Sequence, residues 1–287
     1  MNDLLAKEKI KKFLFEDIGT EDLTVSSIFS ENTQGSGEFI AKSDGIICGL
    51  KIPAMVYELL KDADFTPLVV EGQQVYKGDI IGRAKGKIQT LLTGERVALN
   101  LMQRMSGIAT KTAKAIAKLD DPTIQVCDTR KTMPYLRLFD KYAVKVGGGK
   151  NHRFGLYDGI VLKDNHLSYA GSLKEAVKKV RRIQGHMIKI EVEVETKEQL
   201  LEAVKANVDI IMFDNRTPAE IKEWRKIVPK SILLEASGGI TIKTIHQFRG
   251  CGVDFISMGE LTHSVDAFDL SFLDPLNKKD FRRKQNA

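Results

Sequence analysis

The sequence has few cysteines, and they lie far apart. The 287 residues include three, Cys48, Cys127 and Cys251, and no two of them have the CxxC spacing of zinc and redox sites. This excludes a disulfide framework or a thiolate metal centre as the feature that organises the fold, and a reducing compartment is expected. Cys127 follows the apolar run TIQV, so we interpret it as a core residue rather than a nucleophile.

Long apolar runs are also absent. No run approaches the roughly 20 residues that a membrane-spanning helix requires, and the N-terminal segment MNDLLAKEKIKKFLFEDIG is amphipathic and charged, unlike a secretory signal. We therefore expect a cytoplasmic protein that makes no membrane contact. Basic runs with interleaved aromatic residues are missing too, although the net charge is +6. A nucleic-acid binder is thus a weaker interpretation than an enzyme that binds small anions.

Cations and glycines are concentrated between Asp128 and His166. This stretch, DTRKTMPYLRLFDKYAVKVGGGKNHRFGLYDGIVLKDNH, contains eight Lys or Arg residues and the triple glycine Gly147–Gly149. Glycine lets the backbone approach a ligand closely, and cations bind anionic groups. We interpret the stretch as half of an active site, in which Lys141, Lys145 and Lys150 are surface or supporting charges.

The first third of the chain mixes helical and strand patterns. Apolar spacing predicts helices over 3–15, over IPAMVYELLK and over 90–119, the last with a kink or break near Gly107. Short glycine-punctuated strands lie between them. The segment EGQQVYKGDII resembles lipoyl and biotin carrier domains, but no lysine stands at a hairpin tip beside methionine, so a compact antiparallel β layer is preferred.

After Pro122 the chain alternates short apolar runs with amphipathic helices. The runs are TIQVC, GIVL, KIEVEVE, DIIMF, SILLEA and DFISM, with YAVKV as a further candidate strand, and the helices are SLKEAVKKVRRI, KEQLLEAVKA, PAEIKEWRKIV and TIKTIHQF. This alternation predicts a parallel sheet. Polar residues follow at least five of the strands, which favours a β/α barrel over a doubly wound sheet. Six or seven strands leave the barrel short of eight, so we expect it to be open.

These patterns predict an α/β protein with two domains. Residues 1–110 should form an N-terminal α/β sandwich domain and residues 111–270 an open β/α barrel that carries the catalytic site. The C-terminal segment 271–287 is a candidate to join the first domain, and its basic end KKDFRRKQNA should be mobile.

Residues at the predicted strand ends form two chemical groups. One is cationic and comprises Arg130, Lys131, His152, Arg153 and Lys163, with Arg96 as a further candidate; the other is acidic and comprises Glu193 and Asp214, with Glu191 and Glu195 beside the first. Two turns, Ser237-Gly238-Gly239 and Ser257-Met258-Gly259-Glu260, follow apolar strands and can present free amides to a phosphate. Such a site suits a sugar phosphate that carries pyrophosphate, a metal ion and an acidic co-substrate.

At these residues the chain resembles the quinolinate phosphoribosyltransferase family, also called nicotinate-nucleotide pyrophosphorylase (carboxylating). The shared blocks run from Glu16 to Ser264 in family order: EDIGTEDLT, GERVALNLMQRMSGIAT, DTRKT, KYAVKVGGGKNHRFGLYDGIVLKDNH, EVEVE, DIIMFDN, EASGGI and GVDFISMGELTHS. The resemblance implies an α/β sandwich domain followed by an open seven-stranded β/α barrel. It also implies phosphoribosyl transfer from phosphoribosyl pyrophosphate to quinolinate, with decarboxylation, in de novo NAD biosynthesis.

The resemblance further implies the roles of individual residues. Lys131, Lys163, Glu193 and Asp214 would act in catalysis, and Glu193 and Asp214 would hold Mg²⁺ together with phosphoribosyl pyrophosphate. The substrate-binding residues would be Arg96, Thr129, Arg130, His152, Arg153, Lys163, Glu193, Asp214, Ser237, Gly238, Gly239, Met258, Gly259 and Glu260. A homodimer is implied in which Arg96 reaches the site across the interface, and assembly beyond the dimer is left open.

Two positions depart from the family pattern. Glu21 stands where the family usually has glycine before Asp-Leu-Thr, and Tyr135 replaces the glycine of Pro-Gly-Leu-Arg. Relatives associated with molybdenum transport lose the NHR and KDNH blocks, which are intact here. Three alternatives remain: a nicotinate-type phosphoribosyltransferase, a Schiff-base barrel lyase that uses Lys163, and a non-enzymatic carrier or interaction module built on EGQQVYKGD.

Overall fold

The computed structural model describes residues 1–274, which form two compact units. Unit 1 contains residues 1–111, 134–147 and the described residues from Val265 onward, and unit 2 contains 112–133 and 148–264. Residues 134–147 thus group with unit 1, although the sequence patterns placed them in the barrel domain. The domain boundaries themselves stay a prediction, because compactness does not show that either unit folds alone. The basic end KKDFRRKQNA lies outside the described residues.

Unit 1 contains a four-stranded antiparallel sheet with the strand order β12-β1-β5-β3. Its strands are β1 (Gln34–Ala41), β3 (Ala63–Pro67), β5 (Ile80–Lys87) and β12 (Leu270–Leu273), and a separate pair joins β2 (Gly45–Ile46) to β4 (Gln74–Val75). The predicted antiparallel layer is confirmed. Strand β12 comes from the far end of the described chain and pairs with β1, which ties the C-terminal segment to this sheet.

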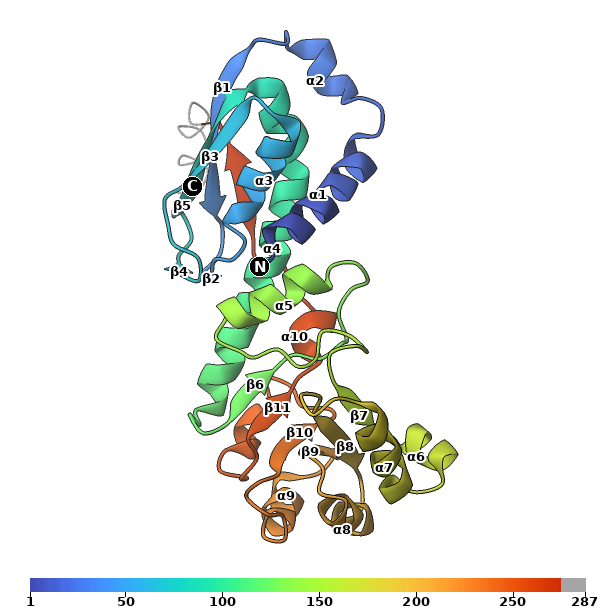
Figure 1. Ribbon diagram of the computed structural model, residues 1–287. Helices are drawn as coiled ribbons and strands as arrows, with labels where there is room; N and C mark the ends of the chain where they lie inside the picture. Colours follow the sequence, from blue (N-terminus) through green and yellow to red (C-terminus); the bar gives the residue numbers. More distant parts are fainter. Residues whose placement is uncertain (275–287) are drawn as a thin grey trace. The chain divides into compact units, whose positions relative to one another are not determined.

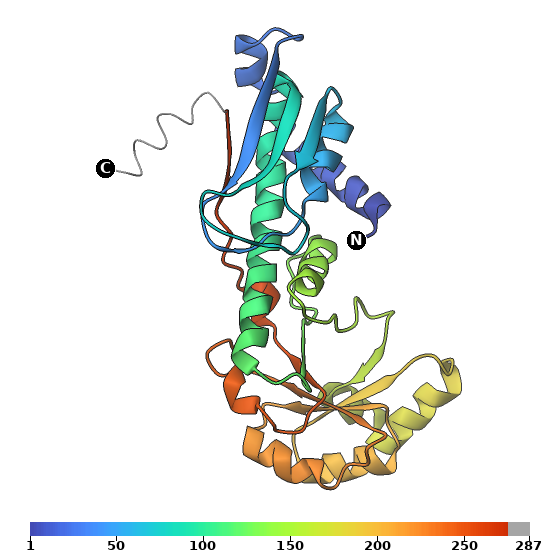
Figure 2. The same cartoon turned by 90° about the vertical axis from the view of Figure 1, so that its left-hand side faces the viewer.

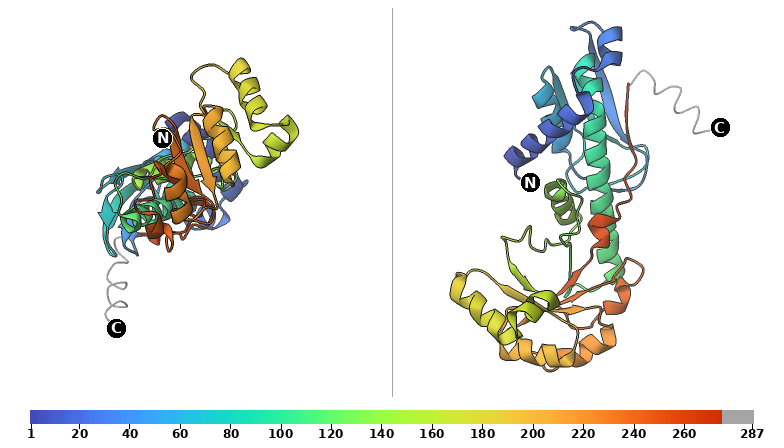
Figure 3. Two further views of the ribbon diagram at one scale, coloured as in Figure 1. Left: turned by 90° about the horizontal axis from the view of Figure 1, so that it is seen from below. Right: turned by 90° about the vertical axis from the view of Figure 1, so that its right-hand side faces the viewer.

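Among the described residues, five helices belong wholly or partly to unit 1. They are α1 (Asp3–Ile18), α2 (Leu23–Ile28), α3 (Lys51–Leu60), α4 (Ile88–Leu119) and α5 (Arg137–Val146), and α4 runs along one face of the sheet (Figures 2 and 3). The predicted break near Gly107 is wrong, because α4 is continuous through it. A side chain at Gly107 would lie 2.2 Å from the carbonyl oxygen of Asp266, so glycine serves close packing there.

Unit 2 contains a six-stranded parallel sheet with the order β6-β11-β10-β9-β8-β7 (Figure 1). The strands are β6 (Gln125–Cys127), β7 (Ile160–Leu162), β8 (Ile190–Val194), β9 (Ile210–Asp214), β10 (Leu233–Ser237) and β11 (Phe255–Ser257). The predicted seventh strand, YAVKV, is instead the end of helix α5. Beside β6, a bridge between Cys127 and Lys150 occupies the seventh position. The open β/α barrel is confirmed with six strands and this bridge.

The helices of unit 2 are α6 (Asp164–Ala170), α7 (Leu173–Ile183), α8 (Lys197–Lys205), α9 (Pro218–Arg225) and α10 (Glu260–His263). Of these, α7, α8 and α9 cover the outer face of the curved sheet (Figures 1 and 2). The predicted helix TIKTIHQF is only a single 3₁₀ turn at Ile245–Phe248. Helices α7, α8 and α9 each begin after a Ser or Thr whose hydroxyl accepts a backbone N–H, namely Ser172, Thr196 and Thr217. Over residues 1–274, no helix combines the length and the apolar character needed to cross a membrane.

Two charged residues are deeply buried. Lys141, interpreted as a surface or supporting charge, is fully buried on α5 and is therefore not a surface charge. In β8, Glu191 is only 4% exposed although it alternates with valines, because both faces of this strand are covered.

Candidate active site

The chemically reactive residues of unit 2 meet at the carboxyl ends of its parallel strands. Thr129, Arg130 and Lys131 follow β6, and Lys163 follows β7 directly. Asp214 and Ser237 are the last residues of β9 and β10, and Gly259 lies just beyond β11. Because parallel strands end at the same edge, residues far apart in the sequence are brought to one place.

These residues line one cavity of about 710 Å³. The expected site residues that line it are Thr129, Arg130, Lys131, His152, Arg153, Lys163, Glu193, Asp214, Ser237, Gly238, Gly239, Gly259 and Glu260. Its walls therefore combine guanidinium and ammonium groups, three carboxylates and a glycine turn. This is the set of groups that a doubly charged acid, a sugar and a phosphate would require.

Two expected site residues do not line this cavity. Met258 is fully buried, so its side chain packs in the core while its neighbour Gly259 faces the cavity. Arg96 lies on α4 in unit 1, where it is exposed.

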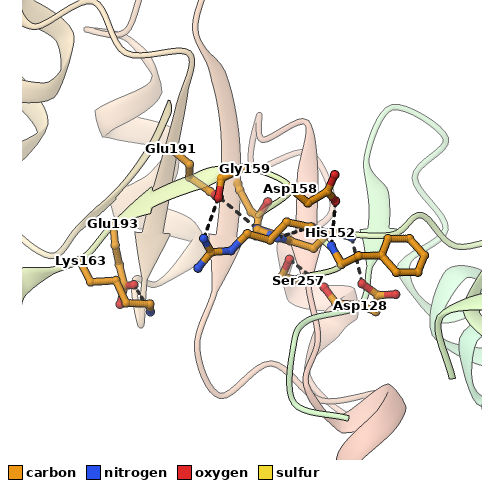
Figure 4. A network of polar contacts seen from close by, with 11 residues as sticks. Asp128, His152, Asp158, Gly159, Lys163, Glu191, Glu193 and Ser257 are labelled. Atoms are coloured by element: carbon orange, nitrogen blue, oxygen red, sulfur yellow. Dashed lines mark hydrogen bonds and ion pairs between the residues drawn. The ribbon is translucent and has the colours of Figure 1, made fainter. Parts of the chain in front are cut away.

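A buried aspartate holds the segment that carries the cationic side chains His152 and Arg153. Asp128 is fully buried, and its Oδ1 accepts the backbone N–H of His152 at 2.9 Å while its Oδ2 accepts the Asn151 amide at 2.6 Å. The Arg153 guanidinium donates to the carbonyl oxygen of Gly159 at 2.7 Å (Figure 4). Burial and repulsion from Arg130 lower the pKa of Arg153, as expected for two guanidinium groups that face the same region. Two such groups suit two adjacent carboxylates.

The ring of His152 is fixed by contacts on both nitrogens. Its Nδ1 accepts the backbone N–H of Arg153 at 2.8 Å, so the proton of the neutral ring resides on Nε2. Nε2 lies 3.0 Å from Glu191, which Figure 4 shows beside the ring, and 3.6 Å from Glu235. Burial and repulsion from Glu191 raise the pKa of Glu235 to about 7.

The acidic wall could hold a hard metal ion. Glu193 forms an ion pair with Lys163, and one carboxylate oxygen from each of Glu193, Glu195 and Asp214 lies within 4.8 Å of the other two (Figure 4 shows the Lys163–Glu193 pair). Carboxylate oxygens are the ligands that Mg²⁺ prefers, usually together with water and substrate phosphates. The donor set therefore fits magnesium.

The turn after β10 has the backbone of an anion-binding loop. Gly238 and Gly239 have φ values of +89° and +62°, a conformation that favours glycine. A side chain at Gly238 would lie 2.3 Å from Oδ1 of Asn215. The carboxylate of Glu260 accepts the backbone N–H of Ile242 at 3.0 Å, so it also stabilises the loop beyond the turn.

Several residues that line the cavity were missed by the sequence analysis. They are Asn215, Thr241, His263 and Ser264 among the polar ones, and Val161, Met212 and Ile240 among the apolar ones. Asn215 directly follows a strand end, and His263 lies in the block GELTHS, so both positions carried a signal. Glu191 and Glu235 lie outside this cavity, and the sequence did not show that they form a buried pair beside His152, because that depends on how the barrel packs.

Comparisons with known proteins agree with this arrangement. Residues 22–106 match the family described as "Quinolinate phosphoribosyl transferase, N-terminal domain", and residues 108–273 match the corresponding C-terminal domain. The chain is 50% identical over 273 residues to a "Probable nicotinate-nucleotide pyrophosphorylase [carboxylating]" from Bacillus subtilis, and the match covers 94% of each chain. A protein of the same description from Synechocystis is 38% identical, with 86% of this chain and 85% of the relative covered.

The chain is also similar to solved structures over most of its length. The crystal structure of NadC from Streptococcus pyogenes is 39% identical with a TM-score of 0.92, and the match covers 95% of this chain and 97% of that one. The nicotinate-nucleotide pyrophosphorylase from Francisella tularensis is 35% identical with a TM-score of 0.89, over 95% and 96% of the two chains.

Proposed function

The chain belongs to the quinolinate phosphoribosyltransferase family, and from this premise we propose that it transfers the phosphoribosyl group of phosphoribosyl pyrophosphate to quinolinate. The products are nicotinate mononucleotide, pyrophosphate and carbon dioxide, and the reaction serves NAD biosynthesis. The observation that carries the proposal is the single cavity in which Arg130 and Arg153 face Glu193 and Asp214, with the Gly238–Gly239 turn beside them.

Each wall of the cavity suits one part of the substrates. Quinolinate is a pyridine with two adjacent carboxylates, and the guanidinium groups of Arg130 and Arg153 can bind them in pairs. The turn at Gly238 and Gly239 offers backbone amides to a phosphate. Glu193 and Asp214 would accept hydrogen bonds from the ribose hydroxyls.

The reaction needs charge stabilisation rather than a covalent nucleophile. The pyridine nitrogen forms a bond to the anomeric carbon while pyrophosphate leaves with the electron pair of the broken C–O bond. Glu193 and Asp214 stabilise the positive charge on the sugar in this transition state, and Lys131 stabilises the leaving group. The bond to the 2-carboxylate then breaks, and its electron pair stays on C2 beside the quaternised nitrogen until C2 takes a proton from solvent.

Magnesium is the cofactor we propose. Glu193 and Asp214 would hold it, with Glu195 within reach. When bound at these carboxylates, a magnesium ion would supply positive charge that offsets the charge of the pyrophosphate group.

We also propose a homodimer and a cytoplasmic location. Arg96 is exposed on α4 of unit 1, where it is free to contact the site of a second subunit and add a further cation for the acidic substrate. A reducing compartment is supported by Cys48, Cys127 and Cys251, which are all buried and not joined in disulfides.

The alternatives are less well supported. A nicotinate-type enzyme binds one carboxylate and would not need two neighbouring guanidinium groups. A Schiff-base lyase needs the Lys163 side chain available to attack a carbonyl carbon, whereas Lys163 is held in an ion pair with the Glu193 carboxylate.

The test is a product assay on the purified protein with quinolinate, phosphoribosyl pyrophosphate and magnesium. We expect pyrophosphate and carbon dioxide in equal amounts. Pyrophosphate release with nicotinate and none with quinolinate would overturn the proposal. Arg153→Ala should raise the KM for quinolinate by about tenfold or more, the cost of one lost charged contact, and change the KM for phosphoribosyl pyrophosphate much less. Arg182→Ala, an exposed arginine on α7, is the matched control.

A further inference from the structure

Asn215 lies between the two parts of the cavity that would hold phosphoribosyl pyrophosphate. It directly follows Asp214 at the end of β9 and lines the cavity itself. Its backbone has a φ of +53°, which is uncommon for a residue other than glycine. Its backbone N–H donates to the carbonyl oxygen of Ser237 at 2.9 Å and so links the ends of β9 and β10.

The side-chain amide contacts the acidic wall. Nδ2 of Asn215 donates to Oδ2 of Asp214 at 2.6 Å. A carboxylate can only accept hydrogen bonds when ionised, so the amide nitrogen must face it. The guanidinium of Arg216 donates to the backbone carbonyl oxygen of Asp214 at 3.1 Å, so it holds the backbone of Asp214 and not its carboxylate. The orientation of the carboxylate therefore depends on Asn215.

The other atom of the same amide contacts the glycine turn. With Nδ2 directed at Asp214, Oδ1 lies over Gly238, where an added side-chain carbon would be only 2.3 Å away. The positive φ of Asn215 therefore places one rigid amide group between a carboxylate and the turn that would bind phosphate. A backbone conformation of this kind persists where the surroundings hold it in place.

We propose that Asn215 is a positioning residue that couples the Asp214 carboxylate to the Gly238–Gly239 turn and thereby sets the affinity for phosphoribosyl pyrophosphate. The inference rests on the proposed function, because it assigns the ribose and the phosphate to these two groups. Asn215 acts through Asp214 and the turn, so the binding of quinolinate should depend on it little.

Two substitutions distinguish the contribution of the Asn215 side chain from that of its backbone. Asn215→Gly keeps the positive φ and the N–H bond to Ser237 but removes the amide, and Asn215→Asp keeps the shape but places a second carboxylate against Asp214. Asn207 provides the matched control, because it is an exposed asparagine of unit 2 with a φ of +50° that does not line the cavity. Asn207→Gly and Asn207→Asp should behave as wild type.

The measurements are the two KM values, kcat, and the binding of phosphoribosyl pyrophosphate with magnesium by calorimetry in the absence of quinolinate. We expect Asn215→Gly to weaken this binding by about tenfold, the effect of losing one hydrogen bond to a charged group. Asn215→Asp should weaken it further, because like charges repel. The KM for quinolinate should change by less than about twofold in both variants, since the lost contact is confined to the other substrate.

Three outcomes would overturn the inference. Unchanged calorimetric binding in both variants is the first. The second is an equal rise in both KM values with a lowered melting temperature, which would indicate a purely structural role. A wild-type protein that binds no phosphoribosyl pyrophosphate would overturn both the inference and the proposed function, whereas an active wild type with unaffected variants overturns the inference alone.

Discussion

Tyr135 illustrates how neighbouring side chains hold a single residue in an unfavourable conformation. Its φ is +71°, and it stands where the family usually has glycine. The Nζ of Lys9 on α1 lies 3.7 Å from the centroid of the Tyr135 ring and donates to the Tyr135 carbonyl oxygen at 2.9 Å. The ring of Phe13 meets the Tyr135 ring edge-on at 6.0 Å. These contacts offset the backbone cost and attach residue 135 to α1 within unit 1.

We therefore expect Tyr135→Gly to destabilise the protein less than Tyr135→Ala. Both lose the cation–π and aromatic contacts, worth about 1–2 kcal/mol together, but only glycine relieves the left-handed backbone, which costs about 1–2 kcal/mol. Chemical denaturation measures the free energy of unfolding of each variant. A double-mutant cycle with Lys9→Met isolates the ring contact, and a coupling energy of zero would show that the cation–π contact contributes nothing.

At the scale of whole elements, the sequence predicted most of the barrel. Each apolar run that is followed by a polar residue is a strand in the structure. Because these strands are parallel, Lys163, Asp214 and Ser237 lie at one edge of the sheet. YAVKV was misread because a run of five residues, four of them apolar, fits a strand or a buried helix equally well. It is helical because Phe139, Ala143 and Val144 lie on one buried face of α5.

The parts of the site that were missed depend on contacts between elements. The proposed role of Asn215 depends on its proximity to Gly238, in the turn that follows β10. A contact of this kind leaves no periodic pattern in the sequence. Glu191 and Glu235 resemble the other strand carboxylates by position. Only the packing of β8 and β10 around His152 decides that these two are buried.

The Gly238 turn should tolerate no side chain. Gly238→Ala and Gly171→Ala both place alanine at a φ near +90°, so each should lower the free energy of unfolding by about 1–2 kcal/mol. Only Gly238→Ala meets a neighbour, Oδ1 of Asn215, because nothing lies within 4 Å of an added carbon at Gly171. We expect Gly238→Ala alone to raise the KM for phosphoribosyl pyrophosphate. Equal KM values in the two variants would contradict this assignment of the turn.

The buried carboxyl of Glu235 should make the stability of the protein depend on pH. Its pKa is raised from 4.5 to about 7 because it is buried near Glu191. The folded state therefore binds its proton more tightly than the unfolded state, so this contribution is complete below pH 4.5 and is lost as the pH rises through 7. The loss is about 3 kcal/mol at most.

Glu235→Gln removes the titrating group, so this decline with pH should be weaker in the variant. Denaturation at pH 5 and at pH 8 gives the difference in free energy of unfolding between variant and wild type. We expect that difference to shift in favour of the variant at pH 8. The same difference at both pH values would show that Glu235 does not hold a proton in the folded protein.

At the scale of the whole molecule, the proposed homodimer would build each site from two subunits. All lining residues of the cavity belong to unit 2, whereas Arg96 is an exposed residue of unit 1. In a symmetric dimer each site would combine Arg153 of one subunit with Arg96 of the other. Arg96→Ala and Arg153→Ala should then each reduce activity strongly when assayed alone.

Mixing the two inactive variants distinguishes a shared site from a site within one chain. After unfolding and refolding together in equal amounts, half of the dimers carry one subunit of each kind. One of their two sites then has both arginines, because its Arg153 and the Arg96 of the partner subunit are both intact. Activity should return to about a quarter of the wild-type value. If Arg96 instead served the site of its own chain, every site in the mixture would lack one arginine, and the activity of the mixture would stay at the level of the single variants.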